Sequence, residues 1–186
     1  MAADLLLFDT SPIVNFCKSG LGIRLDEAIA GRGAFTATVL RELERKVAQF
    51  SSIGPFLERW PAKCVLSLSP RQRLDVVDLL GAFQLPGDHP RANEGEIATY
   101  VKALQLRDEG RPHIVVIDDG DGKRLVRRAR GLTWAGTVDL IFEMVQAQIL
   151  TVEEGGRVWR ATFSDRRKWA DYRSKLEAWS GEATSA

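Results

Sequence analysis

The chain is poor in cysteine and histidine, and no stretch of it is apolar for long. Of its 186 residues, two are cysteine and two are histidine. Cys17 and Cys64 lack the spacing of a disulfide or metal-binding framework, which favours the reducing cytoplasm as compartment. The apolar runs are too short to span a bilayer, so no membrane partner is expected. The first apolar run has no basic segment before it and ends at Asp9, so we expect no secretory leader.

The chain also lacks an excess of charge of either sign. It has 26 Lys and Arg residues against 25 Asp and Glu residues, a formal net charge of +1, so global charge indicates no particular partner. Basic residues nevertheless cluster after the last acidic run, at Lys123, Arg124, Arg127, Arg128 and Arg130. Such a cluster beside an acidic pocket suits the phosphates of a polyanion. The alternative is a solvated helix face.

Strand-like and helix-like patterns alternate along most of the chain. The purely apolar runs 5–8 and 114–117 predict buried parallel strands, and shorter strands are expected at 33–35, 64–68 and 132–134. Helical spacing occurs between them, and residues 71–83 form one such segment with Leu74, Val77 and Leu80 expected on its inner side. The alternation predicts an α/β fold with a central, mostly parallel sheet and helices on both faces. A further helix is expected at 165–179.

Four acidic segments, far apart in sequence, lie next to the predicted ends of strands and helices. Asp9 and Asp118 each follow a buried strand directly, so parallel strands would bring both to one sheet edge. Glu42 lies one turn into a predicted helix, and Glu96 lies in the first turn of another. Each acid alone has an ordinary explanation as a cap or as dipole compensation. Together they would repel one another unless neutralised, and the usual neutraliser is Mg²⁺ or Mn²⁺.

The ordered set of motifs resembles the PIN-domain ribonucleases, and within them the VapC-like toxins of bacterial toxin–antitoxin pairs. The motifs are LLLFDTS, VLREL, GE at a helix start, VVIDD at a strand end, and Gly-Thr before an apolar helix. The resemblance covers roughly residues 5–150. It implies a PIN-like three-layer fold, with a nuclease domain over residues 1–152 and a C-terminal helical extension over residues 153–186.

The resemblance also implies a role for each acid. Asp9 would be the first metal ligand, Glu42 the second acid and Glu96 the third, with Glu94 as the alternative in a shifted register. The DDGDG segment leaves the fourth acid open. The implied catalytic residues are Asp9, Glu42, Glu96, Asp118 and Asp119, and the implied metal ligands are Asp9, Glu96, Asp118, Asp119 and Asp121.

Supporting groups follow from the same resemblance. Ser11 and Thr137 would hydrogen-bond a carboxylate or metal-bound water, and Arg124, Arg127 and Arg128 would contact RNA phosphates. The implied activity is that of an Mg²⁺- or Mn²⁺-dependent endoribonuclease. It would act as a toxin with a small cognate antitoxin as partner, and the protein would be a homodimer.

Other functions are weighed against this one. A catalytically inactive PIN-like module that binds a metal or a protein would retain the same acids. A phosphoacceptor of receiver type would need paired acids after the first strand and a lysine at the end of the last, and the chain has neither pattern. A dinucleotide-binding protein would need a glycine-rich first turn, where this chain has DTSPIVN.

Overall fold

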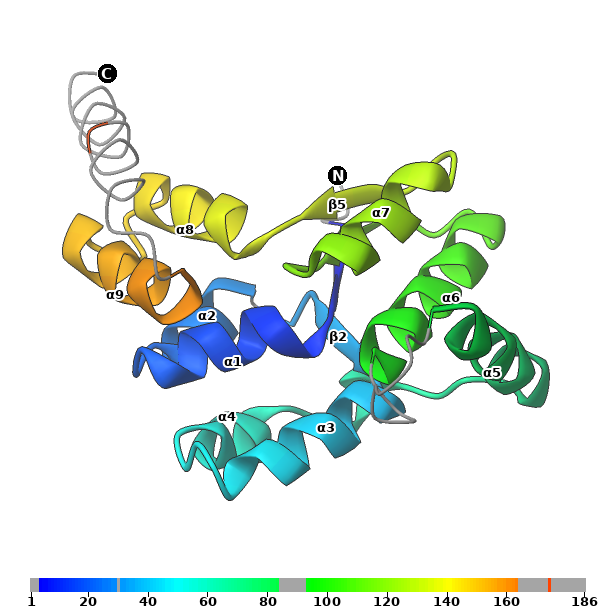
Figure 1. Ribbon diagram of the computed structural model, residues 1–186. Coiled ribbons are helices and arrows are strands. Elements are labelled where there is room, and N and C mark those ends of the chain that lie inside the picture. Colours follow the sequence, from blue (N-terminus) through cyan, green and yellow to red (C-terminus); the bar gives the residue numbers. More distant parts are fainter. Residues whose placement is uncertain (1–3, 30, 84–92, 164–173, 175–186) are drawn as a thin grey trace.

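A computed structural model describes residues 4–29, 31–83, 93–163 and 174 (Figure 1). The strands within these ranges are β1 (Leu5–Phe8), β2 (Gly33–Thr36), β3 (Val65–Leu66), β4 (His113–Val116) and β5 (Thr133–Ala135). The described helices before residue 84 are α1 (Thr10–Lys18), α2 (Gly22–Ile29), α3 (Ala37–Val47), α4 (Ile53–Arg59), the 3-10 turn η1 (Ala62–Cys64) and α5 (Pro70–Phe83). Those that follow are α6 (Glu94–Asp108), α7 (Gly120–Arg128), α8 (Thr137–Gln146) and α9 (Val152–Thr162).

The five strands form one parallel sheet in the order β3-β2-β1-β4-β5. In the centre of this sheet Phe8 is in register with Phe35 on one side and with Val116 on the other. The chain builds the sheet outward from β1, first toward β3 and then toward β5. The order therefore reverses between β1 and β4, which is where open parallel sheets bind ligands, at the carboxyl ends of the strands.

Alternating side chains of β1 divide the core between the two faces of the sheet. Leu6 and Phe8 belong to a cluster with the apolar residues of α1 to α4, α8 and α9, whereas Leu7 packs in a second cluster with α6 and α7. Helix α5 packs on α6 through a third, smaller cluster. The result is three layers, and the predicted α/β class with a parallel sheet covered on both faces is confirmed.

Two local predictions differ from the structure. The strand expected at 64–68 is limited to Val65–Leu66, because Cys64 completes a 3-10 turn. The inner face predicted for α5 was wrong: Leu74 and Val77 are 65% and 62% exposed, and Val76 is buried instead. The apolar residues of α5 fit two stripes at helical spacing, one through Leu74 and Val77 and the other through Val76. The stripe through Val76 is the one that packs against α6.

The C-terminal part of the described chain packs on the core. Val158 and Trp159 of α9 are buried in the same cluster as residues of α1 and α8. The helix predicted at 165–179 lies outside the described residues, apart from Ser174, and the boundary predicted between 152 and 153 stays a prediction. None of the helices in the described ranges is both long and apolar enough to cross a membrane.

Candidate acidic site

Asp9 lies where β1 passes into α1, at the point where the strand order reverses. Its N–H donates to the carbonyl oxygen of Val116 at 2.9 Å, which continues the pairing of β1 with β4. Asp9 is the N-cap of α1, since its Oδ2 accepts from the N–H of Ser11 at 3.3 Å. The residue is 1% exposed, and its Oδ1 has no hydrogen-bond partner within the described part of the chain.

Glu42 connects three helices near Asp9. Its Oε1 accepts from the N–H of Gly95 at 2.9 Å, and its Oε2 accepts from the hydroxyl of Thr10. Gly95 fits this contact because a Cβ at that position would lie 2.5 Å from Glu42 Oε2. The carboxylate thus fixes α3 against the first turns of α1 and α6.

Asp118, after β4, is held as firmly as Glu42. Its Oδ1 accepts from the N–H of Thr137 at 2.7 Å, and its Oδ2 accepts from Asn15 Nδ2 at 2.9 Å and from the hydroxyl of Thr137. The hydroxyl of Thr137 therefore contacts a carboxylate, one of the two contacts expected for it. The N-terminus of α8 also favours a negative charge at this position.

Burial and mutual repulsion disfavour the charged forms of Asp9 and Glu96. The pKa of Asp9 is raised from 3.8 to about 7, first by burial and then by the charges of Glu42 and Asp118. The pKa of Glu96 is raised from 4.5 to about 8, first by burial and then by the charges of Asp9, Asp119 and Glu42. The backbone N–H groups of Thr10 and Ser11 lower the first pKa, and that of Gly122 lowers the second, without reversing either shift.

The acids therefore fall into two kinds. Glu42 and Asp118 are compensated by protein donors, whereas Asp9 and Glu96 lack sufficient compensation for their charge. An unpartnered, buried carboxylate oxygen beside further carboxylates has the chemistry of a site for a hard divalent cation. By this test Asp9 and Glu96 fit Mg²⁺ or Mn²⁺. Within the ranges that the structure describes, however, no three His, Cys, Asp or Glu side chains are grouped so that they could hold a metal ion.

Three further acids were candidates for the site. Asp119 is exposed and acts on Glu96 through its charge. Asp121 lies in α7, and its side chain is outside what the structure describes. Glu94, the alternative to Glu96, is directed toward Arg41, with 3.9 Å between its Oε1 and Arg41 Nη2. Glu96 is thus the acid of the GE motif that shares the environment of Asp9.

The basic residues predicted to contact RNA lie on α7, which begins directly after Asp118 and Asp119. Arg124, Arg127 and Arg128 are exposed, and the guanidinium of Arg127 lies 4.8 Å from the centre of the Trp134 ring. Lys123 Nζ lies 5.2 Å from the same ring. A Cβ at Gly136 would lie 3.4 Å from Lys123 Nζ and 3.2 Å from Asp118 Oδ1, so this ammonium lies on the side of α7 that faces the acids.

Two polar residues of the site were missed by the sequence reasoning. Thr10 and Asn15 are buried in α1 and donate to Glu42 and Asp118, respectively. A signal was present for Asn15, because it is an amide among the otherwise apolar residues 12–17. Its partner, 103 positions away, could not be inferred from that signal.

The comparisons with known proteins add no relative. No family model matches the chain, and neither a curated protein nor a solved structure matches it significantly. The likeness to PIN-domain ribonucleases thus remains a resemblance of motifs, and the geometry of the acids is the structural observation that bears on function.

Proposed function

We propose that the protein is a divalent-metal-dependent endoribonuclease of PIN-like type, with its active site at the carboxyl ends of β1 and β4. The observation that carries the proposal is the buried Asp9 carboxylate, which has an oxygen without a partner among the described residues and a pKa of about 7 among Glu42, Glu96 and Asp118. Burying uncompensated acids destabilises a fold, so such a group is typical of a site that a cation completes.

The residues of the site have different roles in the proposed reaction. Asp9 and Glu96 would hold the cation, with Asp118 and Asp119 as the acids that follow β4. Bound Mg²⁺ or Mn²⁺ supplies charge neutralisation for the phosphodiester and acidifies water. Asn15 and Thr137 orient Asp118, and Thr10 and Gly95 orient Glu42. The exposed arginines of α7 would bind neighbouring phosphates of the RNA.

The wider biological proposal is a toxin of the cytoplasm, kept inactive by a small cognate antitoxin and acting as a homodimer. It is supported by the resemblance of motifs alone. A neighbouring gene for a small DNA-binding protein, and growth arrest on expression that co-expression of that neighbour relieves, would support it further.

The nuclease proposal is tested with Asp9→Asn and a matched control, Asp78→Asn, whose carboxylate is exposed on α5. We expect wild type and Asp78→Asn to cleave single-stranded RNA with Mn²⁺ or Mg²⁺ and to stop when the cation is chelated. Asp9→Asn should lose at least a hundredfold in rate. Equal cleavage by wild type and Asp9→Asn, or cleavage that leaves cyclic phosphate ends without metal, would show contamination or a wrong site.

A second function is favoured by one observation, the lack of a ready-made metal-binding group within the described ranges. A catalytically inactive PIN-like binding module would retain the acids without assembling them. In that case wild type would cleave no RNA under any metal condition, and Mn²⁺ would raise the melting temperature of wild type and of Asp9→Asn equally.

A further inference from the structure

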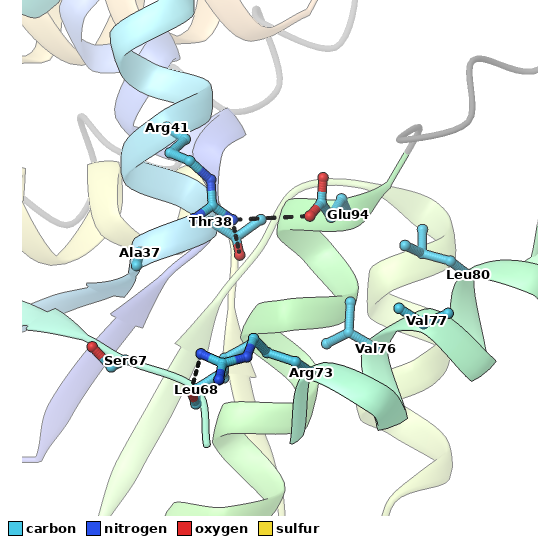
Figure 2. A pocket seen from close by; sticks show the side chains of 10 residues that line it. All are labelled: Ala37, Thr38, Arg41, Ser67, Leu68, Arg73, Val76, Val77, Leu80 and Glu94. Carbon is cyan, nitrogen blue, oxygen red and sulfur yellow. Dashed lines mark hydrogen bonds and ion pairs between the residues drawn. The ribbon is translucent and has the colours of Figure 1, made fainter. Parts of the chain in front are cut away.

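A groove opens at the carboxyl ends of β2 and β3, beside the acidic site. It has a volume of about 260 Å³ and lies between α3, the segment after β3, and α5 with the first turn of α6 (Figure 2). This volume is just below the roughly 300–1,000 Å³ of pockets for drug-sized ligands, so it suits a single ring system and not a large ligand.

The lining of the groove combines an apolar wall with two guanidinium groups. Leu68, Val76 and Val77 supply apolar surface, and Val77 is 62% exposed. Arg41 donates to the hydroxyl of Thr38 at 3.1 Å, and Arg73 donates to the carbonyl oxygen of Leu68 at 3.2 Å (Figure 2). A guanidinium has five N–H donors, so these contacts leave donors on both arginines for a ligand.

A single carboxylate, that of Glu94, is present among the described residues that line the groove. Its Oε1 lies 3.9 Å from Arg41 Nη2, and its side chain is 17% exposed. A carboxylate of this kind can accept hydrogen bonds from the N–H groups on the edge of a base, as Asp and Glu do with cytosine.

The groove and the acidic site share a wall. Arg41 and Glu42 are consecutive in α3, and Glu94 and Gly95 are consecutive in α6. The 2.9 Å hydrogen bond from Gly95 N–H to Glu42 Oε1 joins the two helices between the groove and the acids. Both sites lie at the same edge of the sheet, so a chain of nucleotides that crosses one would reach the other.

We propose that this groove binds one nucleotide of single-stranded RNA next to the phosphodiester at the acidic site. This inference rests on the proposed ribonuclease function and specifies where its substrate binds. The base lies against Leu68 and Val77, a guanidinium stacks on its exposed face, and Glu94 accepts from its N–H edge. Arg73 contributes positive charge for the adjoining phosphate. The groove therefore selects the base beside the cleaved bond, and it favours bases with N–H donors on that edge.

Binding is tested in the Asp9→Asn background, with a fluorescein-labelled single-stranded RNA of random sequence followed by fluorescence anisotropy. Arg73→Ala is compared with Arg71→Ala, an exposed arginine of the same helix that does not line the groove. We expect Arg73→Ala to weaken binding about tenfold and to reduce the slope of log K against log salt by about 0.7, the value for one phosphate of a single strand. Arg71→Ala should change neither the affinity nor the salt slope. If the two variants behave equally, the proposal that the groove binds RNA is wrong.

The apolar wall offers a second matched pair. Val77 lines the groove, whereas the equally exposed Leu74 of α5 does not. Val77→Asp should weaken RNA binding at least tenfold, and Leu74→Asp should leave it within twofold of the parent. If Val77→Asp instead converts a dimer to a monomer, measured by light scattering, and RNA binding is unchanged, the face is covered by a second copy and the proposal is wrong.

Base selection is read from the ends that the otherwise wild-type enzyme produces on random RNA. Glu94→Gln should reduce the preference for the favoured base at the cut site by about fivefold or more, since one good base contact supplies about 1–3 kcal/mol. If wild type cleaves RNA and Glu94→Gln has the same base preference, the groove proposal is wrong and the nuclease proposal stands. If wild type does not cleave RNA but Arg73→Ala binds it more weakly than its parent, the nuclease proposal is wrong and the groove still binds RNA. If wild type does not cleave RNA and Arg73→Ala binds it as its parent does, both proposals are wrong.

Discussion

Asp9 differs from the neighbouring acids Glu42 and Asp118 in how its charge is compensated. Glu42 and Asp118 each receive hydrogen bonds on both oxygens, whereas one oxygen of Asp9 receives none from the described residues. A carboxylate that is buried and flanked by other carboxylates lowers the stability of the fold when it ionises. The site therefore carries a local instability that a proton or a cation relieves.

This difference predicts how stability depends on pH. The folded-state pKa values of Asp9 and Glu96, about 7 and about 8, lie above their ordinary values of 3.8 and 4.5. Their contribution to stability is therefore fully present below the ordinary values, falls as pH rises above them, and is lost once pH has passed the folded-state values. With metal chelated, we expect the free energy of unfolding of wild type to fall relative to that of Asp9→Asn as pH rises, measured by urea denaturation. Each unit of pKa shift corresponds to about 1.4 kcal/mol.

Added Mg²⁺ or Mn²⁺ should oppose this loss. The cation competes with protons for the same carboxylates, so it should stabilise wild type more at high pH than at low pH, and Asp9→Asn much less than wild type. Wild type and Asp9→Asn with parallel stability curves in chelator would contradict the environment described for Asp9.

The side-chain partners mark the limit of what the sequence could predict at this scale. The sequence identifies the first polar residue after each apolar run. Because parallel strands end at the same edge of a sheet, it also predicted that Asp9 and Asp118 lie at one edge. The hydrogen bond from Asn15 to Asp118 joins residues 103 positions apart and leaves no periodic pattern. Such contacts depend on how helices dock, which local sequence does not encode.

At the scale of elements, the first turn of α6 is held closely against α3. Gly95 donates to Glu42, and its lack of a Cβ lets α3 and α6 approach. Glu94 and Glu96, on either side of it, face the groove and the acidic site, respectively. One helical turn therefore connects both candidate sites. The GE motif has a glycine at this position because a side chain would collide with Glu42.

This contact gives a paired glycine prediction. Gly95→Ala places a Cβ 2.5 Å from Glu42 Oε2, so we expect it to lower stability by about 1–3 kcal/mol and to reduce RNA cleavage. A Cβ at Gly81, in α5, would meet no atom of the described residues within 4 Å, so Gly81→Ala should stabilise the helix by about 0.5–1 kcal/mol. Thermal denaturation of both variants measures the signs, and a stabilising Gly95→Ala would show that α3 and α6 are not held this closely.

Helix α5 shows why the sequence predicted elements better than their orientation. Its length and position were predicted well, because apolar residues recur at helical spacing between Pro70 and Phe83. Two stripes fitted that spacing, and the surface of α6 selects the one through Val76. The remaining apolar side chains, among them Val77, are left at the rim of the groove.

At the scale of the molecule, α9 completes the layer that covers one face of the sheet. This helix packs against α1 and α8, and its Trp159 is 3% exposed, with its ring centre 4.5 Å from that of Phe163. The core on this face of the sheet therefore includes residues of α9.

Removal of this side chain should be costly. Trp159→Ala should lower the free energy of unfolding by about 3–5 kcal/mol, measured by urea denaturation, because it leaves a large cavity in the core. Phe163→Ala is the control, since Phe163 is 36% exposed and should cost clearly less. A loss below about 1 kcal/mol for Trp159→Ala would mean that α9 is not part of the cooperative unit.

The hydrogen bonds on Asp118 have a consequence for synthesis of the chain. Helix α1 provides Asn15 early, but the other donor to this carboxylate is Thr137, which leaves the ribosome more than a hundred residues later. A growing polypeptide therefore cannot complete the hydrogen bonds on Asp118 until residue 137 has been translated. Under the proposed ribonuclease function, messenger and ribosomal RNA next to the exit tunnel would be spared for most of that time.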